Sequence, residues 1–437
     1  MQTPPLDLSI ESLTSLPPGR QQRVPLIVFS HLRWGFVFQR PQHVLSRLAR
    51  HFDVYFVEEP VLAEGPPTLT RSTQQGGVQV VTPRTPVRAP GFHDDQLAVL
   101  KPLIEQFVAA QRLAEPLVWL YTPMALPLIA DLEPRAVVYD CMDDLASFKF
   151  APPELIAREA ALMAQADVVF TGGPSLYESR RGRHSNLHCL PSAVDADHFT
   201  PSRLDATSAE GVAAAALHRA MPHPRLGFFG VIDERLDLEL VAGIADQRPG
   251  WHIVMVGPVV KIDPATLPRR ANILWAGMQR YEALPHLMSH WDVCLLPFAL
   301  NEATRFISPT KTLEYLAGGK PVVSTPIKDV VSLYGAAVHI AATADEFVAA
   351  AETALAERPQ AVADWRARAQ ALVDGCTWDG TAGAMAELLL ADVETSPAPS
   401  IVLDEPLATA KPREAEGSTT AAPVERAVRS ERPLAAM

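Results

Sequence analysis

The chain contains 437 residues, 48% of them hydrophobic, and carries a formal net charge of −12 at pH 7. This length predicts two to three globular domains, and the acidic balance argues against a general nucleic-acid-binding protein. The sequence has no run of about 18 apolar residues, which would predict a membrane span. Residues 1–13 lack the basic and apolar regions of a signal peptide. The four cysteines are scattered without metal-ligand spacing, so we expect free thiols in a reducing cytoplasm.

The first half of the chain alternates short apolar strands with helices. Continuous apolar runs such as VPLIVFS at 24–30 are typical of strands buried in a parallel sheet. Repeated strand–helix units predict an α/β fold with a doubly wound parallel sheet, here over residues 24–200. Residues 1–23 are expected to be disordered and 60–77 to be a loop. The expected strands are 24–30, 54–57, 78–82, 117–121, 136–140, 168–171 and 187–190, and the expected helices are 41–51, 94–112, 123–131, 153–166 and 174–183.

A polar, alanine-rich connector at 201–223 leads to a second series of comparable size, expected to form a domain over 224–375. A further helix is expected within 376–394. Residues 395–437 contain no aromatic side chain and many Ala and Pro residues, which predicts a disordered tail. Ligands bind such sheets at the carboxyl ends of the strands, so we expect a cleft between the two sheets. The expected strands are 226–229, 252–256, 273–276, 293–297, 321–325 and 337–340, and the expected helices are 236–247, 281–290, 309–318, 345–357 and 360–374.

The stretch 305–330 predicts a loop, a helix, a tight turn and a buried strand. Ser308 suits the N-cap of this helix, and Pro309 suits its first position, where the missing N–H costs nothing. Lys311 lies in the first turn, and free N–H groups beside a lysine would bind an anion such as a phosphate. Glu314 lies one turn deeper on the same face, where its carboxylate suits ribose hydroxyls. The alternative is a surface helix with an incidental Lys–Glu pair.

This stretch resembles the nucleotide-sugar site of retaining, GT-B-fold glycosyltransferases, in particular bacterial glycosyltransferase family 4, also described as glycosyl transferases group 1. The resemblance rests on Glu314, the small-residue turn at 317–319 and the Pro-Val-Val strand at 321–323. It implies that Glu314 holds the donor ribose. Some family members also share the SPTK sequence found at 308–311. The usual family pattern has another Glu eight positions before the one at 314, and that Glu normally contacts the donor sugar. This chain has Phe306 at that position, so the contact with the donor sugar is expected to differ.

The second domain opens with FFGVIDER over 228–235. The family usually has Gly-Arg here and a Lys a few residues later, and both side chains grip the donor diphosphate. Val231 stands where that Arg is expected, and Arg235 is the natural substitute for the Lys; a solvated arginine is the alternative. The donor-binding residues implied by the resemblance are Gly230, Ser308, Pro309, Thr310 and Glu314, with Lys311 and Arg235 as catalytic cations at the leaving diphosphate.

In the first domain, the loop and helix start after the first strand face the expected cleft. The stretch WGFVFQRPQH at 34–43 resembles a signature of family-4-like transferases from surface-polysaccharide clusters. Two Arg and two His around one helix tip suit an acceptor or a phosphate, although His43 alone is equally typical of a hydrogen-bonded core histidine. The residues predicted on this side are His31, Arg33, Gly35, Arg40 and His43.

Acidic residues follow the expected strand at 136–140. Family members often carry His-Asp at this strand end, close to the reacting sugar, and here Met142 replaces the His while Asp143 matches the Asp. We expect Asp143 to be the carboxylate at the reaction site, with Asp140 as the second choice. The D-x-D triplet at 195–197 matches the family's crossover into the second domain better than a metal motif, so no metal is assigned.

A basic cluster lies at one helix end of the first domain. Its members suit either a solvated face or an anionic membrane surface, which would be useful with a lipid-linked acceptor. The cluster consists of Arg180, Arg181, Arg183 and His184.

The resemblance covers roughly residues 24–392 and implies two facing Rossmann-like domains, with the last helix crossing back to the first domain. It implies a cytoplasmic enzyme, in peripheral contact with the inner membrane face if its acceptor is lipid-linked. The reaction implied is transfer of a sugar, with retention, from a UDP- or GDP-linked donor to a glycan or lipid-linked acceptor in surface-polysaccharide biosynthesis. No cofactor and no nucleic acid are expected. The alternatives are a nucleotide-sugar epimerase and a nucleotide-sugar-binding protein without turnover.

Overall fold

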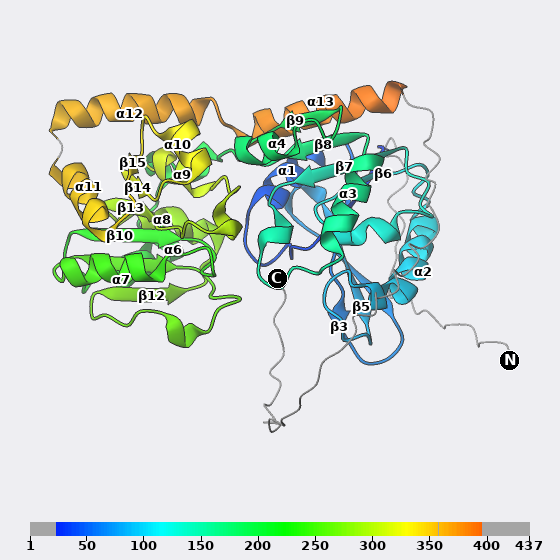
Figure 1. Cartoon of the computed structure of the whole chain (residues 1–437), viewed down its shortest axis with the longest axis horizontal. Coiled ribbons are helices and arrows are strands. Elements are labelled where there is room, and N and C mark those ends of the chain that lie inside the picture. Colours follow the sequence, from blue (N-terminus) through cyan, green and yellow to red (C-terminus); the bar gives the residue numbers. More distant parts are fainter. Residues whose placement is uncertain (1–22, 357, 396–437) are drawn as a thin grey trace, which may run out of the picture.

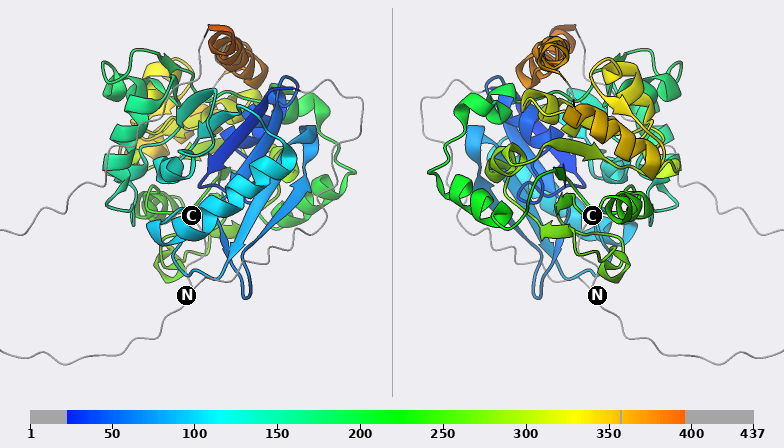
Figure 2. Two further views of the ribbon diagram at one scale, coloured as in Figure 1. Left: turned by 90° about the vertical axis from the view of Figure 1, so that its right-hand side faces the viewer. Right: turned by 90° about the vertical axis from the view of Figure 1, so that its left-hand side faces the viewer.

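The computed structural model describes residues 23–356 and 358–395 and forms two α/β domains that lie side by side (Figure 1). The views along the long axis show the twisted sheet of each domain with helices around it (Figure 2). Apart from residues 23 and 395, the segments expected to be disordered lie outside the described residues.

The first domain contains a sheet in the order β3-β5-β2-β1-β6-β7-β8-β9, with β4 paired to β5. All of its pairs are parallel except β4 with β5. The strands are β1 (Pro25–Ser30), β2 (Asp53–Glu58), β3 (Val61–Leu62), β4 (Thr68–Thr73), β5 (Gln79–Thr85), β6 (Leu117–Leu120), β7 (Ala136–Cys141), β8 (Val168–Thr171) and β9 (Leu187–Cys189). The α-helices are α1 (Arg40–Leu48), α2 (Asp94–Gln111), α3 (Leu155–Gln165) and α4 (Pro174–Arg180).

The second domain contains a parallel sheet in the order β12-β11-β10-β13-β14-β15. Its strands are β10 (Arg225–Phe229), β11 (His252–Val256), β12 (Ile273–Gly277), β13 (Val293–Leu296), β14 (Val322–Ser324) and β15 (His339–Ile340). The helices from here to the end of the described chain are α5 (Ala196–Phe199), α6 (Ala209–His218), α7 (Leu238–Gln247), α8 (Leu284–Ser289), α9 (Lys311–Ala317), α10 (Lys328–Tyr334), α11 (Ala344–Ala356), α12 (Pro359–Asp374) and α13 (Trp378–Thr395).

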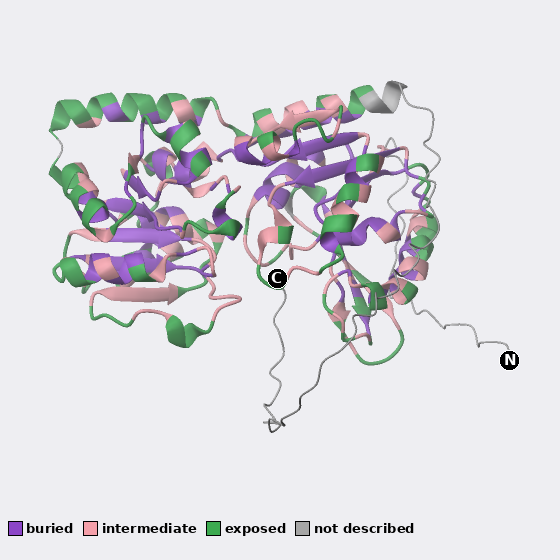
Figure 3. Cartoon of the chain, in the orientation of Figure 1, coloured by how far each residue is buried: buried purple, intermediate pink, exposed green. Residues whose placement is uncertain are grey.

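The apolar runs in the sequence form the buried strands. In β1, every residue after Pro25 is buried, because β1 pairs with β2 on one side and β6 on the other. One apolar cluster fills the second domain, and two clusters fill the first domain. Figure 3 shows the consequence: the central strands of both sheets are buried, whereas the helices around them have exposed outer faces.

The local structure differs from the expected elements at three places. The expected loop at 60–77 contains β3 and β4, and β4 escaped notice because its sequence, TLTRST, is polar and its residues are partly or fully exposed. The expected connector at 201–223 contains α6, where alanine-rich sequence favours a helix and the Ser208 hydroxyl accepts a hydrogen bond from the Gly211 N–H at 3.0 Å. The short helix α10 was not expected.

The last helix packs on the first domain, as predicted. Trp378 and Leu389 of α13 belong to the same buried cluster as Val44 and Leu45 of α1. Figure 1 shows α12 along the second domain and α13 along the first. The first domain is therefore completed by a segment that follows the whole of the second domain in sequence.

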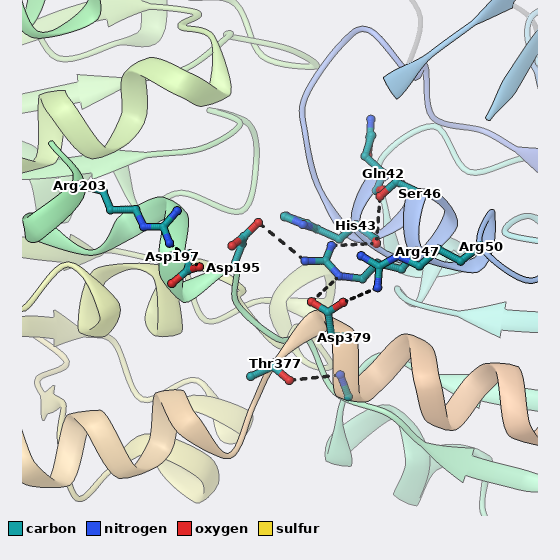
Figure 4. Close-up of polar contacts among 11 residues, drawn as sticks. Gln42, His43, Ser46, Arg47, Arg50, Asp195, Asp197, Arg203, Thr377 and Asp379 are labelled. Atoms are coloured by element: carbon teal, nitrogen blue, oxygen red, sulfur yellow. Dashed lines mark hydrogen bonds and ion pairs between the residues drawn. The ribbon is translucent and has the colours of Figure 1, made fainter. Parts of the chain in front are cut away.

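The chain passes between the domains at two places that lie next to each other. The Val194 N–H donates a hydrogen bond to the Cys376 carbonyl at 3.0 Å, which joins the outgoing and returning segments. Arg47 of α1 and Arg50, just after this helix, each donate to the Asp379 carboxylate at 3.0 Å (Figure 4). Arg47 also lies 3.7 Å from the Asp195 carboxylate. These contacts fix both crossings to α1.

Candidate active site

A cavity of about 590 Å³ lies between the two domains, at the carboxyl ends of strands from both sheets. The first domain lines it with the loop 34–40 after β1, with Met142 and Asp143 after β7, and with Ser192. The second domain lines it with loops that follow β10, β11, β12 and β13 and with the beginning of α9. The sheet topology therefore brings the predicted donor and acceptor sides to one cavity.

Lys311 and Glu314 of α9 both line the cavity. Glu314 is only 7% exposed, which excludes the alternative of a surface Lys–Glu pair. Burial raises the pKa of Glu314 to about 7, although the positive charge of Lys311 opposes this rise. Burial also lowers the pKa of Lys311. The two side chains are therefore a desolvated cation and a desolvated carboxylate on one wall.

The start of α9 differs from the prediction. The helix begins at Lys311, its N-cap residue is Thr310, and no side chain caps it. Pro309 and Thr310 line the cavity. Ser308, expected as the N-cap and as a donor-binding residue, is not among the lining residues. Its hydroxyl is instead buried beside Gly173 of the first domain. The prediction of a Ser308 cap was wrong because tertiary packing takes this side chain away from the helix.

Gly230 allows Lys311 to reach the cavity. A Cβ atom built on Gly230 would overlap with Cε of Lys311, and the φ angle of Gly230 is +149°, which L residues rarely adopt. The neighbouring Phe229 N–H donates to the Tyr315 hydroxyl at 3.0 Å, which ties β10 to α9. The close approach of these two elements therefore requires a glycine at the end of β10.

Arg235 lines the cavity and is held in place from two sides. Its guanidinium donates two close hydrogen bonds to the Asp233 carboxylate, Nε to Oδ1 at 3.0 Å and Nη2 to Oδ2 at 2.6 Å. It also lies over the ring of Phe148, a first-domain residue, with 5.3 Å between the guanidinium carbon and the ring centroid. Arg235 is thus a fixed cation at the boundary of the two domains.

Asp143 lines the cavity from the first domain, whereas the two cations line it from the second domain. Burial raises the pKa of Asp143, and the positive charge of Arg235 is the largest influence in the other direction. The positive charge of Lys311 also lowers the pKa of Asp143, as that of Arg235 does. The three residues predicted as catalytic therefore surround one cavity.

Lys261 was not predicted from the sequence. It follows β11, and its ammonium lies 4.8 Å from the centroid of the Phe148 ring. Its charge also influences the pKa of Asp143. A single lysine in the loop sequence GPVVKID carries no local signal for this position, because its contacts come only from tertiary packing.

Asp140, the second choice for the reaction-site carboxylate, forms a buried ion pair with Arg40. Arg40 donates to Asp140 from Nε at 3.0 Å and from Nη2 at 2.9 Å, and it donates to the Leu190 carbonyl at 2.8 Å. Asp140 is fully buried and Arg40 is 3% exposed. Arg40 does border the cavity, but its guanidinium is engaged in joining α1 to β7 and to the residue just after β9. These contacts indicate that the Arg40–Asp140 ion pair has a structural role.

Of the other residues predicted on the acceptor side, only Gly35 lines the cavity. Arg33 donates to the Glu59 carbonyl at 2.7 Å and to the Pro60 carbonyl at 3.2 Å, so it holds the segment after β2. His43 is buried and stacks on Trp378, with 4.7 Å between the ring centroids, which matches the core alternative. Burial lowers the pKa of His31 to about 4.

The predicted basic cluster is largely paired within the first domain. Arg180 is 5% exposed and donates to Asp144 at 2.7 Å and to Glu159 at 2.8 Å. Arg183 lies 3.6 Å from Glu159. Arg180 therefore belongs neither to a solvated face nor to a surface that could contact a membrane.

Within residues 23–356 and 358–395, no helix has the length and apolar character needed to cross a bilayer.

An aromatic contact across the cavity was also missed. Phe38 of the first domain stacks on Tyr281 of the second domain, with 4.4 Å between the ring centroids, and both residues line the cavity. His198, in the segment that connects the domains, stacks on the other side of the Tyr281 ring, with 4.1 Å between the ring centroids.

No group of three or more His, Cys, Asp and Glu side chains in the described part of the chain is arranged to hold a metal.

Comparison with known proteins supports the fold and the type of enzyme. Residues 223–357 match the family model described as Glycosyl transferases group 1. The chain is 25% identical over 284 residues to TuaH of Bacillus subtilis (strain 168), whose name assigns it to the glycosyltransferases of teichuronic acid biosynthesis. This match covers 59% of the chain and 68% of TuaH.

Two solved structures illustrate the structural similarity. Sucrose-phosphate synthase from Thermosynechococcus elongatus superposes with a TM-score of 0.65 at 16% identity, covering 86% of this chain and 100% of that one. Anabaena HepE in complex with UDP and glucose gives a TM-score of 0.60 at 16% identity, covering 84% of this chain and 100% of that one. These matches confirm the predicted GT-B fold.

Proposed function

We propose that this chain, a glycosyltransferase of the GT-B type, transfers a sugar with retention from a UDP- or GDP-linked donor to a glycan or lipid-linked acceptor in surface-polysaccharide biosynthesis. The observation that carries the proposal is the position of Lys311, Glu314 and Arg235 on one wall of the interdomain cavity, opposite Asp143. Two cations and a carboxylate match the diphosphate and the ribose of a nucleotide donor.

Each residue has a distinct part in the proposed reaction. Glu314 accepts hydrogen bonds from the ribose hydroxyls. Lys311 and Arg235 stabilise the negative charge that develops on the departing diphosphate, and burial strengthens this interaction. Asp143 lies across the cavity from both cations, where the transferred sugar would sit. The loop 34–40 of the first domain forms the acceptor wall.

The relatives support this choice of donor and setting. HepE has been solved in complexes with UDP and glucose and with UDP-glucose, which supports a UDP-linked donor here. TuaH is named for the biosynthesis of teichuronic acid, which supports a polysaccharide product.

A screen of UDP- and GDP-sugars, with binding, hydrolysis and transfer measured separately, tests the proposal. Transfer with the product anomer matching that of the donor, determined by NMR, is the expected result. Binding without hydrolysis or transfer would identify a nucleotide-sugar-binding protein. Conversion of the donor into its epimeric nucleotide sugar, in the absence of any acceptor, would identify an epimerase.

We also propose that the enzyme does not need a metal, because Lys311 and Arg235 supply positive charge at the diphosphate. Once a donor is identified, activity should survive EDTA. The measurement is the transfer rate before and after chelation, with Mg²⁺ or Mn²⁺ added back. A rate that collapses on chelation and returns with either ion would show that this assignment is wrong.

Replacing Gly230 by Ala should lower turnover, because the new Cβ would displace the Lys311 side chain. Forcing a non-glycine residue into this backbone conformation costs roughly 1–3 kcal/mol, so the melting temperature should fall as well. Gly250→Ala is the matched control, because Gly250 has open space around its Cβ position. Steady-state kinetics and thermal unfolding measure both effects. A Gly230→Ala enzyme with the wild-type kcat would show that the position of the Lys311 side chain does not matter for catalysis.

A further inference from the structure

Position 306 contacts the first domain. The Phe306 ring packs against the first-domain apolar cluster that includes Cys141 at the end of β7 and Leu176 of α4. The guanidinium carbon of Arg305 lies 5.1 Å from the centroid of the same ring. Phe306 belongs to the segment that leads into α9, so this apolar contact anchors the segment before Lys311 to the first domain.

A second contact lies nearby and is polar. Asp329 of α10, in the second domain, accepts a hydrogen bond from the Ser175 N–H at 3.0 Å. Ser175 is in the first turn of α4, whose free N–H groups need acceptors. Asp329 and Ser175 are each 1% exposed. The second domain therefore supplies a buried cap for a helix of the first domain.

Gly173 of the first domain lies beside the polar contact and beside Ser308, in the segment that contains Phe306. A Cβ atom on Gly173 would overlap with Oδ2 of Asp329 and would lie 2.6 Å from Cβ of Ser308. The absence of a side chain at 173 thus lets the first domain approach both α10 and the segment before α9. Oδ2 of Asp329 and the hydroxyls of Ser175 and Ser308 are buried together here.

We propose that Phe306 and Asp329 form an interdomain latch, and that Asp329 is a positioning residue for the reaction. The latch holds the segment 306–311 and α10 against α4. It thereby fixes Lys311 on the wall opposite Asp143. Phe306 stands where the resembling family has a Glu that contacts the donor sugar, and in this chain it contacts the first domain instead. The effect on turnover rests on the proposed function, whereas the domain contact does not.

Hydrogen exchange of the full chain tests the latch directly. Asp329→Ala removes the acceptor of the Ser175 N–H, so amide exchange in residues 172–180 of the first domain should become faster. Asp329→Asn keeps an oxygen that accepts from this N–H, so exchange there should stay at the wild-type rate. Val331→Ala is the matched control, because Val331 is an exposed residue of the same helix. A residue that only stabilised α10 would change exchange in the second domain and leave 172–180 unchanged.

Small-angle X-ray scattering and kinetics complete the test. Asp329→Ala and Phe306→Ala should both increase the radius of gyration, since each loosens the domain contact. With an active donor, Asp329→Ala should lower kcat about tenfold while UDP affinity changes by less than about twofold. Unchanged exchange at 172–180 in Asp329→Ala, or an Asp329→Asn variant as impaired as Asp329→Ala, would overturn the latch. If no nucleotide sugar is turned over but exchange and scattering respond as expected, the latch stands and the proposed function fails.

Discussion

Replacing Lys311 by Ala should lower kcat about 10²-fold or more and change the donor KM much less. The ammonium lies in a desolvated wall, where burial lowers the pKa of Lys311 and its charge interacts strongly with an anion. The diphosphate gains negative charge as its bond to the sugar breaks, so the interaction strengthens in the transition state. Steady-state kinetics with an identified donor measure both constants.

Two further variants separate charge from packing at this position. Lys311→Met keeps the length of the side chain that crosses Gly230 and removes only the charge, so its kcat should match that of Lys311→Ala. Lys328→Ala removes an exposed lysine of α10 and should behave like the wild type. A Lys311→Met enzyme with nearly full kcat would show that the side chain acts by packing.

Replacing Glu314 by Gln should weaken donor binding roughly ten- to a hundredfold. The buried carboxylate accepts hydrogen bonds from the ribose in the ground state and in the transition state alike. A charge-assisted hydrogen bond is worth about 1.5–3 kcal/mol, which corresponds to this change in affinity. Titration with UDP or GDP measures it without turnover. Glu302→Gln is the control, because Glu302 is an exposed residue outside the cavity.

The same carboxylate should give donor binding a pH dependence. Burial raises the pKa of Glu314 from 4.5 to about 7, so the free enzyme carries a protonated Glu314 below that pH. The proton must leave before both ribose hydroxyls can donate to the carboxylate. Nucleotide affinity should therefore rise with pH up to about 7 and be constant above it, and Glu314→Gln should remove this dependence. If Lys311 and Glu314 variants both bind and react like the wild type, α9 is not the donor site.

The sequence predicted the parts of the fold that depend on local pattern. Strands such as β1 and β11 are continuous apolar runs, and burial on both faces of a parallel sheet requires that composition. The polar strand β4 has no such signal, because it pairs at one edge and remains exposed. Lys311 and Glu314 were predicted from their places on a helix and from the family resemblance, and Arg235 and Asp143 from the resemblance; all four line the interdomain cavity.

The contacts that differ from the prediction, or were not predicted, join distant parts of the chain. Arg40 and Asp140 are separated by 100 positions, and nothing local distinguishes an arginine in an ion pair from an arginine free to bind a ligand. Ser308 has the sequence context of a helix cap, but the approach of Gly173 draws it into the domain boundary. Lys261 and Phe38 have their positions only through partners on other loops. Such pairings follow from the complete fold, which local propensity does not specify.

The position of α13 bears on the order in which the protein folds during synthesis. The first domain leaves the ribosome early, yet Trp378 and Leu389, which fill one face of its core, are among the last described residues to emerge. The part of this apolar cluster that α13 covers therefore remains open until α13 is translated. The core of the second domain ends with Val373 of α12, so this domain can complete its own folding just before α13 emerges. In this protein the N-terminal domain depends on the C-terminal one being finished, and a chain truncated before Trp378 would leave that apolar face open to aggregation.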